Sequence, residues 1–156
     1  MLRTDRVMIL FIAASAMVLI SACNDDENDW SIVDDDEKSS ELVEFLVDYK
    51  EQWENSLQAG TFSTVEPYFV SNSQVYHMER RQHQQISGRR EVEQFLSYED
   101  LSIQANSHGE YRITWKESVE ISGTDEDRKI NRTRSYTINE RSDGSYRIIS
   151  VEREDD

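Results

Sequence analysis

The sequence predicts an α+β fold, in which helices in the first half of the chain pack against a four-stranded antiparallel meander in the second half. Two patterns along the 156 residues carry this prediction. Apolar residues recur at spacings of three and four between Leu42 and Leu57, which indicates a helix with one apolar stripe. After Tyr98, apolar and polar residues alternate, which is the period of strands. Helices followed by strands in this order are typical of α+β proteins.

The chain is acidic, with a formal net charge of −15, and it contains one cysteine. This charge argues against a nucleic-acid partner, which needs clustered Lys and Arg to neutralise phosphates. It also argues against direct docking onto anionic lipid head groups. One cysteine forms no internal disulfide, and no Cys and His pair stands at the spacing of metal ligands. The length fits one domain, for which we expect no metal and no cofactor.

The first residues have the pattern of an export signal. Arg3 and Arg6 precede an apolar run over residues 8–20, which is shorter than the roughly 20 residues of a membrane span. The run ends in Ile20-Ser21-Ala22-Cys23. This ending resembles the lipobox of bacterial lipoproteins, in which an aliphatic residue and two small ones precede a cysteine.

The resemblance implies that a signal peptide, residues 1–22, is cleaved between Ala22 and Cys23. It also implies that the Cys23 thiol, a good nucleophile as its thiolate, receives a diacylglyceryl group. Two acyl chains anchor a protein stably, so we expect a membrane partner through Cys23 and a location outside the cytoplasm. The alternative is an uncleaved anchor in which the cysteine is incidental.

An acidic segment, residues 24–38, follows the cysteine. It carries eight acidic residues against one base, Lys38, and few apolar residues. Such a segment buries little surface and its charges repel one another, so we expect residues 23–38 to form an extended, disordered tether. The alternative is a contact with cations or the cell wall.

The first predicted helix begins near Ser39 and ends at Gly60. Ser39 or Ser40 can cap its start, and glycine suits the left-handed position after a helix. Its stripe consists of Leu42, Phe45, Leu46, Tyr49, Trp53 and Leu57.

Three shorter helices are predicted after it. Ser63 and Glu66 stand at the spacing of a capping box, and Ser71 and Gln74 repeat it, which indicates a second helix and a third helix that reaches about Ile86. We expect a further short helical stretch over residues 89–96, beyond the break at Gly88. The strands are then expected over residues 101–105, 111–121, 130–138 and 146–151, with a hairpin signal at Asp143-Gly144.

Two stretches carry a more specific resemblance. Tyr49-Lys50-Glu51-Gln52-Trp53, followed by Gly60-Thr61-Phe62-Ser63-Thr64-Val65-Glu66-Pro67-Tyr68-Phe69, resembles the extracellular domain of TcaA-type membrane proteins of Gram-positive bacteria, which are associated with teicoplanin resistance. The order of helices and strands is also similar to the nuclear transport factor 2-like (NTF2-like) cone fold. On this resemblance, residues 39–153 form a TcaA-like cone domain and residues 154–156 an acidic tail.

The resemblance implies a non-enzymatic role in the cell envelope, linked to the response to wall antibiotics, and it supplies no catalytic residue. TcaA-type proteins usually carry a cytoplasmic zinc ribbon and a membrane-spanning helix. We expect neither in this chain, and we expect lipid on Cys23 to take the place of the membrane helix.

Candidate ligand-binding residues fall into two groups. Glu117 lies on the apolar face of its predicted strand, and Arg134 shares a face with Tyr136 on the next strand. We expect a Glu117–Arg134 cross-strand ion pair; the alternative is that Glu117 is a catalytic acid in the cone cavity. The second group consists of Arg80, Arg81, Arg89 and Arg90. These arginines either bind an anionic partner, such as a teichoic acid or a phospholipid head group, or balance nearby acidic residues.

Two functions therefore remain open. The first is a binding or scaffolding module that engages an envelope protein or a wall polymer. The second is a small-molecule-binding or hydrolytic cone domain with a pocket around Glu117 and Arg134. A closed, filled interior favours the first, and an open pocket favours the second.

Overall fold

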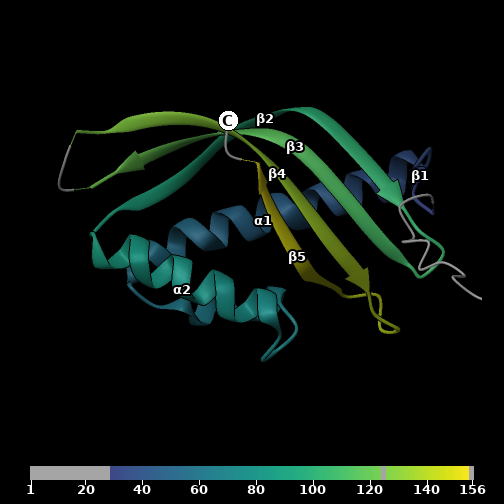
Figure 1. The fold of residues 1–156 in the computed structure, drawn as a ribbon, viewed down its shortest axis with the longest axis horizontal. Coiled ribbons are helices and arrows are strands. Elements are labelled where there is room, and N and C mark those ends of the chain that lie inside the picture. Colours follow the sequence, from purple (N-terminus) through teal and green to yellow (C-terminus); the bar gives the residue numbers. More distant parts are fainter. Residues whose placement is uncertain (1–28, 124–125, 155–156) are drawn as a thin grey trace, which may run out of the picture.

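The computed structural model of the chain describes residues 29–123 and 126–154. Within them, two α-helices, two 3₁₀ turns and five strands occur: β1 (Ser31–Ile32), α1 (Asp36–Ala59), η1 (Phe62–Thr64), η2 (Glu66–Tyr68), α2 (Gln74–Gly88), β2 (Val92–Ala105), β3 (Glu110–Ser122), β4 (Arg128–Glu140) and β5 (Tyr146–Glu154). The strands form one antiparallel sheet in sequence order, and Figure 1 shows the long strands curving over α1. The predicted signal peptide and Cys23 lie outside the described residues.

Helix α1 begins earlier than the sequence predicts. The carboxylate of Asp35 accepts hydrogen bonds from the backbone N–H groups of Glu37 and Lys38, both at 3.0 Å, so Asp35 is the N-cap and not Ser39 or Ser40. The predicted end is confirmed, because Gly60 adopts φ 68° at the C-cap. The apolar stripe faces the sheet, and its members Leu42, Leu46, Tyr49, Trp53 and Leu57 are buried.

The segment between the long helices is less regular than predicted. In place of one short helix, two 3₁₀ turns form, and the first is capped by Thr61, whose hydroxyl accepts from the N–H of Ser63. Helix α2 then begins after Ser73, whose side chain accepts from the N–H of Tyr76, and it extends to Gly88. The third predicted helix is therefore confirmed, with its cap two residues later than expected.

The expected helical stretch over residues 89–96 is wrong. After Arg90, which has φ 56°, the chain enters β2 and pairs with β3, starting with Val92 opposite Ser122. Backbone pairing along a long neighbouring strand outweighs the local helical preference of these residues. The predicted strand at 101–105 is thus the end of a 14-residue strand that contains two bulges, between Phe95 and Ser97 and between Glu99 and Ser102.

The predicted disordered tether is wrong from Asp29 onward. Ser31 and Ile32 pair with Ala105 and Gln104 as the short edge strand β1. The indole of Trp30 lies against the guanidinium of Arg112, with 4.1 Å between the guanidinium carbon and the ring centroid. The edge of the sheet offers unpaired backbone groups and a cation, and these order a segment whose composition alone indicates disorder.

Candidate functional site

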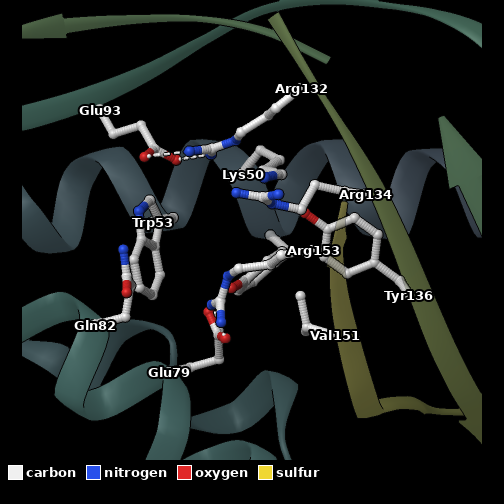
Figure 2. A pocket seen from close by; sticks show the side chains of 11 residues that line it. Lys50, Trp53, Glu79, Gln82, Glu93, Arg132, Arg134, Tyr136, Val151 and Arg153 are labelled. Atoms are coloured by element: carbon white, nitrogen blue, oxygen red, sulfur yellow. Dashed lines mark hydrogen bonds and ion pairs between the residues drawn. The ribbon is translucent and has the colours of Figure 1, made fainter. Parts of the chain in front are cut away.

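The space between α1 and the concave face of the sheet holds a group of charged side chains, here called the interior charge cluster (Figure 2). Six elements contribute to it: α1, α2, β2, β4 and β5 line a small pocket, and β3 adds a carboxylate beside it. Its members are Lys50, Glu79, Glu93, Glu117, Arg132, Arg134 and Arg153.

Glu117 lies at the centre of the cluster and is fully buried. Its two carboxylate oxygens accept from Lys50 Nζ and Arg132 Nε, each at 2.7 Å. Trp115 Nε1 donates a further hydrogen bond at 3.1 Å, and the Tyr136 hydroxyl donates one at 3.5 Å. Four donors from α1, β3 and β4 therefore fix this carboxylate.

The predicted Glu117–Arg134 ion pair is wrong. In the register of β3 and β4, Glu117 lies opposite Arg132, and Arg134 lies opposite Trp115. The side-chain pattern places all three charged residues on the concave face, but a shift of two residues in register changes the partner without changing the face.

The surroundings of Glu117 keep its carboxyl group ionised. Burial alone would raise the pKa of Glu117, but the neighbouring charges of Lys50 and Arg132 outweigh burial and lower this pKa to about 2. A general acid or base exchanges its proton near the working pH. At neutral pH, Glu117 is therefore ionised and lacks the proton that a catalytic acid requires.

Two further ion pairs extend the cluster. The guanidinium of Arg132 also binds Glu93 through both terminal nitrogens, with Nη1 at 3.0 Å from Oε2. Arg153 on β5 binds Glu79 on α2. The Arg132–Glu93 pair joins β4 to β2, and the Arg153–Glu79 pair joins the sheet to α2. Together with the Lys50–Glu117 pair to α1, the interior charges therefore connect the sheet to both helices.

Arg134 is the exception in the cluster. It is 7% exposed, and among the described residues its only hydrogen bond runs from Nη1 to the backbone oxygen of Thr133, at 3.2 Å. Burial and the nearby charge of Arg132 lower the pKa of Arg134. Figure 2 shows its guanidinium directed into the space between α1 and β4.

The pocket inside the cluster is small. Its volume is about 20 Å³, which is room for about one water molecule. Aromatic rings fill the interior nearby, including Tyr49, Trp115 and Tyr136, each at most 3% exposed. An organic substrate does not fit in this space without movement of the surrounding side chains.

The second predicted group does not form one patch. Arg80 and Arg81 are exposed in the middle of α2, whereas Arg89 and Arg90 follow its end, roughly 13 Å further along at 1.5 Å per residue. Arg89 is paired with Glu91 at 2.7 Å. The structure therefore supports local charge balance for Arg89 and leaves Arg80 and Arg81 facing solvent.

A shallow hollow of about 410 Å³ lies between α2 and the turn after α1. Arg80 and Phe62 line it, and so does His83, which is only 3% exposed. The His83 ring lies edge-on to Trp53 and Phe62, with ring centroids 5.6 and 5.5 Å apart, and its Nε2 has no hydrogen-bond partner among the described residues. Burial lowers the pKa of His83, so the ring takes up a proton less readily than an exposed histidine.

Sequence reasoning missed Lys50 and Glu79 as members of the cluster. Both interrupt an apolar stripe: Lys50 follows Leu46 and precedes Trp53 at helical spacing, and Glu79 stands four residues before His83. A charged residue in the buried stripe of a helix signals a buried partner. Glu93 and Arg153 gave no such signal, because β2 was not recognised at Glu93 and the last strand was expected to end before Arg153.

A family model described as the TcaA protein NTF2-like domain matches residues 38–152. The chain belongs to the TcaA NTF2-like domain family. The match covers most of the helices and strands of this TcaA-type domain, and it begins three residues after the Asp35 cap. The predicted family and the α+β, NTF2-like fold class are therefore confirmed.

Two further similarities agree with this assignment. An uncharacterised protein of Alkalihalophilus pseudofirmus is 22% identical over 150 residues, which are 96% of this chain and 94% of that protein. A crystal structure of a candidate dehydratase of the NTF2-like family from Streptomyces avermitilis superposes with a TM-score of 0.53 at 13% identity, over 72% of this chain and 94% of that one. The second similarity shows the fold of the TcaA-type domain and does not extend to activity.

Within the described residues of the TcaA-type domain, no group of three or more His, Cys, Asp or Glu side chains could hold a metal ion. None of the helices in this part of the chain is long and apolar enough to cross a membrane.

Proposed function

We propose that this TcaA-type domain is a lipid-anchored, extracytoplasmic module with a non-catalytic binding or scaffolding role in the bacterial cell envelope. One observation carries the non-catalytic part: ion-paired charges and aromatic rings fill the interior of the cone and leave about 20 Å³. The carboxylate best placed for acid–base chemistry, Glu117, accepts hydrogen bonds from two cations. A filled, ion-paired interior of this kind favours a rigid scaffold over an enzyme active site.

The sequence before the described residues supports the anchor. Cys23 is the single cysteine of the chain and ends the Ile20-Ser21-Ala22-Cys23 pattern. Five residues lie between Cys23 and Asp29, whose carboxylate accepts from the backbone N–H of Ser107 at 3.1 Å. This length spans at most roughly 20 Å, so a lipid on Cys23 would hold the β1 edge of the sheet close to the membrane surface.

The anchor is tested by metabolic labelling with an alkyne palmitate analogue, followed by partition in a detergent that separates into two phases. We expect label and detergent-phase recovery for the wild type, and neither for Cys23→Ala. Recovery of the wild type in the aqueous phase, or label that persists in Cys23→Ala, would contradict a lipid on Cys23.

The binding role is tested by crosslinking in intact cells and pull-down of the full chain from its own membranes. We expect a defined envelope protein or wall polymer with the wild type, and its loss or marked reduction with Cys23→Ala, which is displaced from the membrane. If no envelope component is enriched over Cys23→Ala, the scaffolding role is wrong.

The family resemblance also predicts a change in sensitivity to antibiotics that act on the cell wall. Growth of a deletion strain in teicoplanin, compared with growth of the wild-type strain, measures this change.

A further inference from the structure

Three arginines lie together on the concave face of β4 and β5. Arg134 is directly opposite Arg153 in the register of these strands, and Arg132 is two residues away on the same face of β4. Like charges in directly opposite positions of adjacent strands repel each other. Such an arrangement persists in a folded protein when anions compensate it.

The carboxylates of the cluster compensate two of these arginines and not the third. Arg132 binds Glu117 and Glu93, and Arg153 binds Glu79. Lys50 takes the other oxygen of Glu117. Four cations therefore share three carboxylates, and among the described residues of the cluster Arg134 is the cation that forms no ion pair, although the charge of Glu117 acts on it.

The unpaired guanidinium borders empty space. Arg134 lines the pocket of about 20 Å³, together with Lys50, Arg132 and Arg153. Its one hydrogen bond, to the Thr133 backbone, uses Nη1 and leaves the other donors of the guanidinium for a ligand. A buried charge without a partner is costly, so this space favours an anion over water.

We infer that the cone interior is a binding site for a small monoanion of about the size of chloride, with Arg134 as its main ligand. The anion completes the charge balance of the cluster, and the guanidinium supplies donors in a planar fork that suits one or two acceptor atoms. The pocket volume excludes larger anions. This inference goes beyond the proposed envelope role, because a site of this kind acts on the folded domain whether or not the chain is lipidated.

The test measures thermal unfolding of the full chain in nonionic detergent at constant sodium concentration, while sodium gluconate is replaced by sodium chloride. Gluconate serves as the bulky reference anion. For the wild type, we expect the Tm to rise as the small anion replaces gluconate and then to level off, as for a ligand that binds only the native state. For Arg134→Gln, we expect this saturable rise to disappear and the Tm in gluconate to exceed that of the wild type.

Arg81→Gln is the matched control, because it removes the same charge from an exposed position on α2 and leaves the interior unchanged. We expect it to keep the wild-type response. An equal response in Arg134→Gln, or a wild type that does not distinguish chloride from gluconate, would overturn the inference.

A second measurement does not depend on the folding of any variant. Chloride is titrated into the wild-type chain by calorimetry, with gluconate making up the ionic strength. We expect a saturable isotherm with one site per chain. Heats of dilution alone would show that the site does not exist. Failure of either measurement leaves the Cys23 labelling result unaffected, so this inference and the proposed function fail separately.

Discussion

At the scale of single residues, the interior of this domain depends on charges whose partners come from distant parts of the chain. Glu117 receives Lys50 from α1 and Arg132 from β4, at equal distances of 2.7 Å. A buried ion pair contributes little net stability compared with an apolar replacement, but removal of one partner leaves an uncompensated charge inside the protein. The effect of a substitution therefore depends on which partner is lost.

Glu117→Gln is expected to lower the free energy of unfolding by about 3–5 kcal/mol, because Lys50 and Arg132 lose their shared anion. Urea denaturation at pH 7 measures this loss. Glu99→Gln is the control, since Glu99 pairs with Lys116 at 3.1 Å on the surface and its side chain is 65% exposed. An exposed pair contributes about 0–1 kcal/mol. Equal losses in both variants would contradict a structural role for Glu117.

The same carboxylate predicts the response to acid. The pKa of Glu117 is about 2 in the native state against an ordinary value of 4.5. A lowered pKa stabilises the native state above the ordinary value, and this contribution is lost as the pH falls from about 4.5 towards about 2. In urea denaturation between pH 5 and pH 2.5, we expect the wild type to lose stability more steeply than Glu117→Gln. Parallel curves for the two proteins would contradict the lowered pKa.

His83 predicts a second pH dependence, in a different range. Burial lowers the pKa of His83 below its ordinary value of 6.5, so the unfolded chain takes up the proton first as the pH falls. The free energy of unfolding should therefore decrease below about pH 6.5, with a slope of at most about 1.4 kcal/mol per pH unit. Urea denaturation between pH 7.5 and pH 5 measures this slope.

His83→Phe should remove this slope, because a phenyl ring fits against Trp53 and Phe62 and does not titrate. His77→Phe is the control, since His77 is exposed on α2. If His83→Phe keeps the wild-type slope and His77→Phe loses it, the dependence does not come from the buried histidine.

At the scale of elements, helix α1 is the central support of the domain, and its first turn joins it to the sheet. Lys38 Nζ lies 3.3 Å from Glu140 Oε2 and donates to the Tyr146 hydroxyl at 2.7 Å. The Asp35 cap in turn fixes the backbone of this first turn. The position of the cap therefore decides where α1 begins.

Asp35→Ala is expected to lower the free energy of unfolding by about 1 kcal/mol, because two N–H groups at the start of α1 lose their acceptor. Ser39→Ala should change it by less than about 0.5 kcal/mol, since Ser39 lies inside the helix and not at its cap. Chemical denaturation of both variants distinguishes the cap in the structure from the cap that the sequence suggests. A larger loss for Ser39→Ala would favour the later start.

At the scale of the whole molecule, the segment before α1 decides how the domain sits relative to its proposed anchor. Trp30 packs on Arg112 of β3, and the N–H of Val33 donates to the carbonyl of Ile103 at 3.1 Å. With Asp29 bound to Ser107, five residues lie between Cys23 and the first residue held at the sheet. A freely mobile tether would instead let the domain sample many orientations.

Trp30→Ala is expected to speed hydrogen exchange at Val33 roughly two- to fivefold, because loss of the contact with Arg112 removes about 0.5–1 kcal/mol from the docked segment. Hydrogen exchange with mass spectrometry measures this change. Ile32→Ala is the control, as the Ile32 side chain is 61% exposed. We expect exchange in α1 to stay unchanged in both variants. Equal protection of Val33 in Trp30→Ala and the wild type would mean that Trp30 does not hold the segment.

Much of the fold could be predicted because its signals are local. The stripe from Leu42 to Leu57 and the alternation through Ile113 and Trp115 depend on residues two to four positions apart, and the structure buries these residues as expected. The stretch over residues 89–96 failed for the opposite reason: its strand depends on pairing with β3, about 25 to 30 residues further along the chain.

The candidate site was predicted only in part. Glu117 and Arg134 were expected in the interior from the face that each occupies, and both are buried there. The partner of Glu117 was not predictable, because a strand face contains several positions and the register selects among them. Lys50 came from another element altogether, and only the packing of α1 under the sheet brings it to Glu117.

The sequence by itself determined the α+β class, the family, the apolar stripe of α1, and which face of β3 and β4 carries each charge, because side-chain periodicity is a property of neighbouring residues. The tertiary structure alone decided the rest. It ordered residues 29–35 against the sheet edge, made a strand of residues 92–96, paired Glu117 with Lys50 and Arg132, and left Arg134 beside a small empty space. These outcomes depend on contacts between elements far apart in the chain, whose free energies exceed the local preferences of the residues involved.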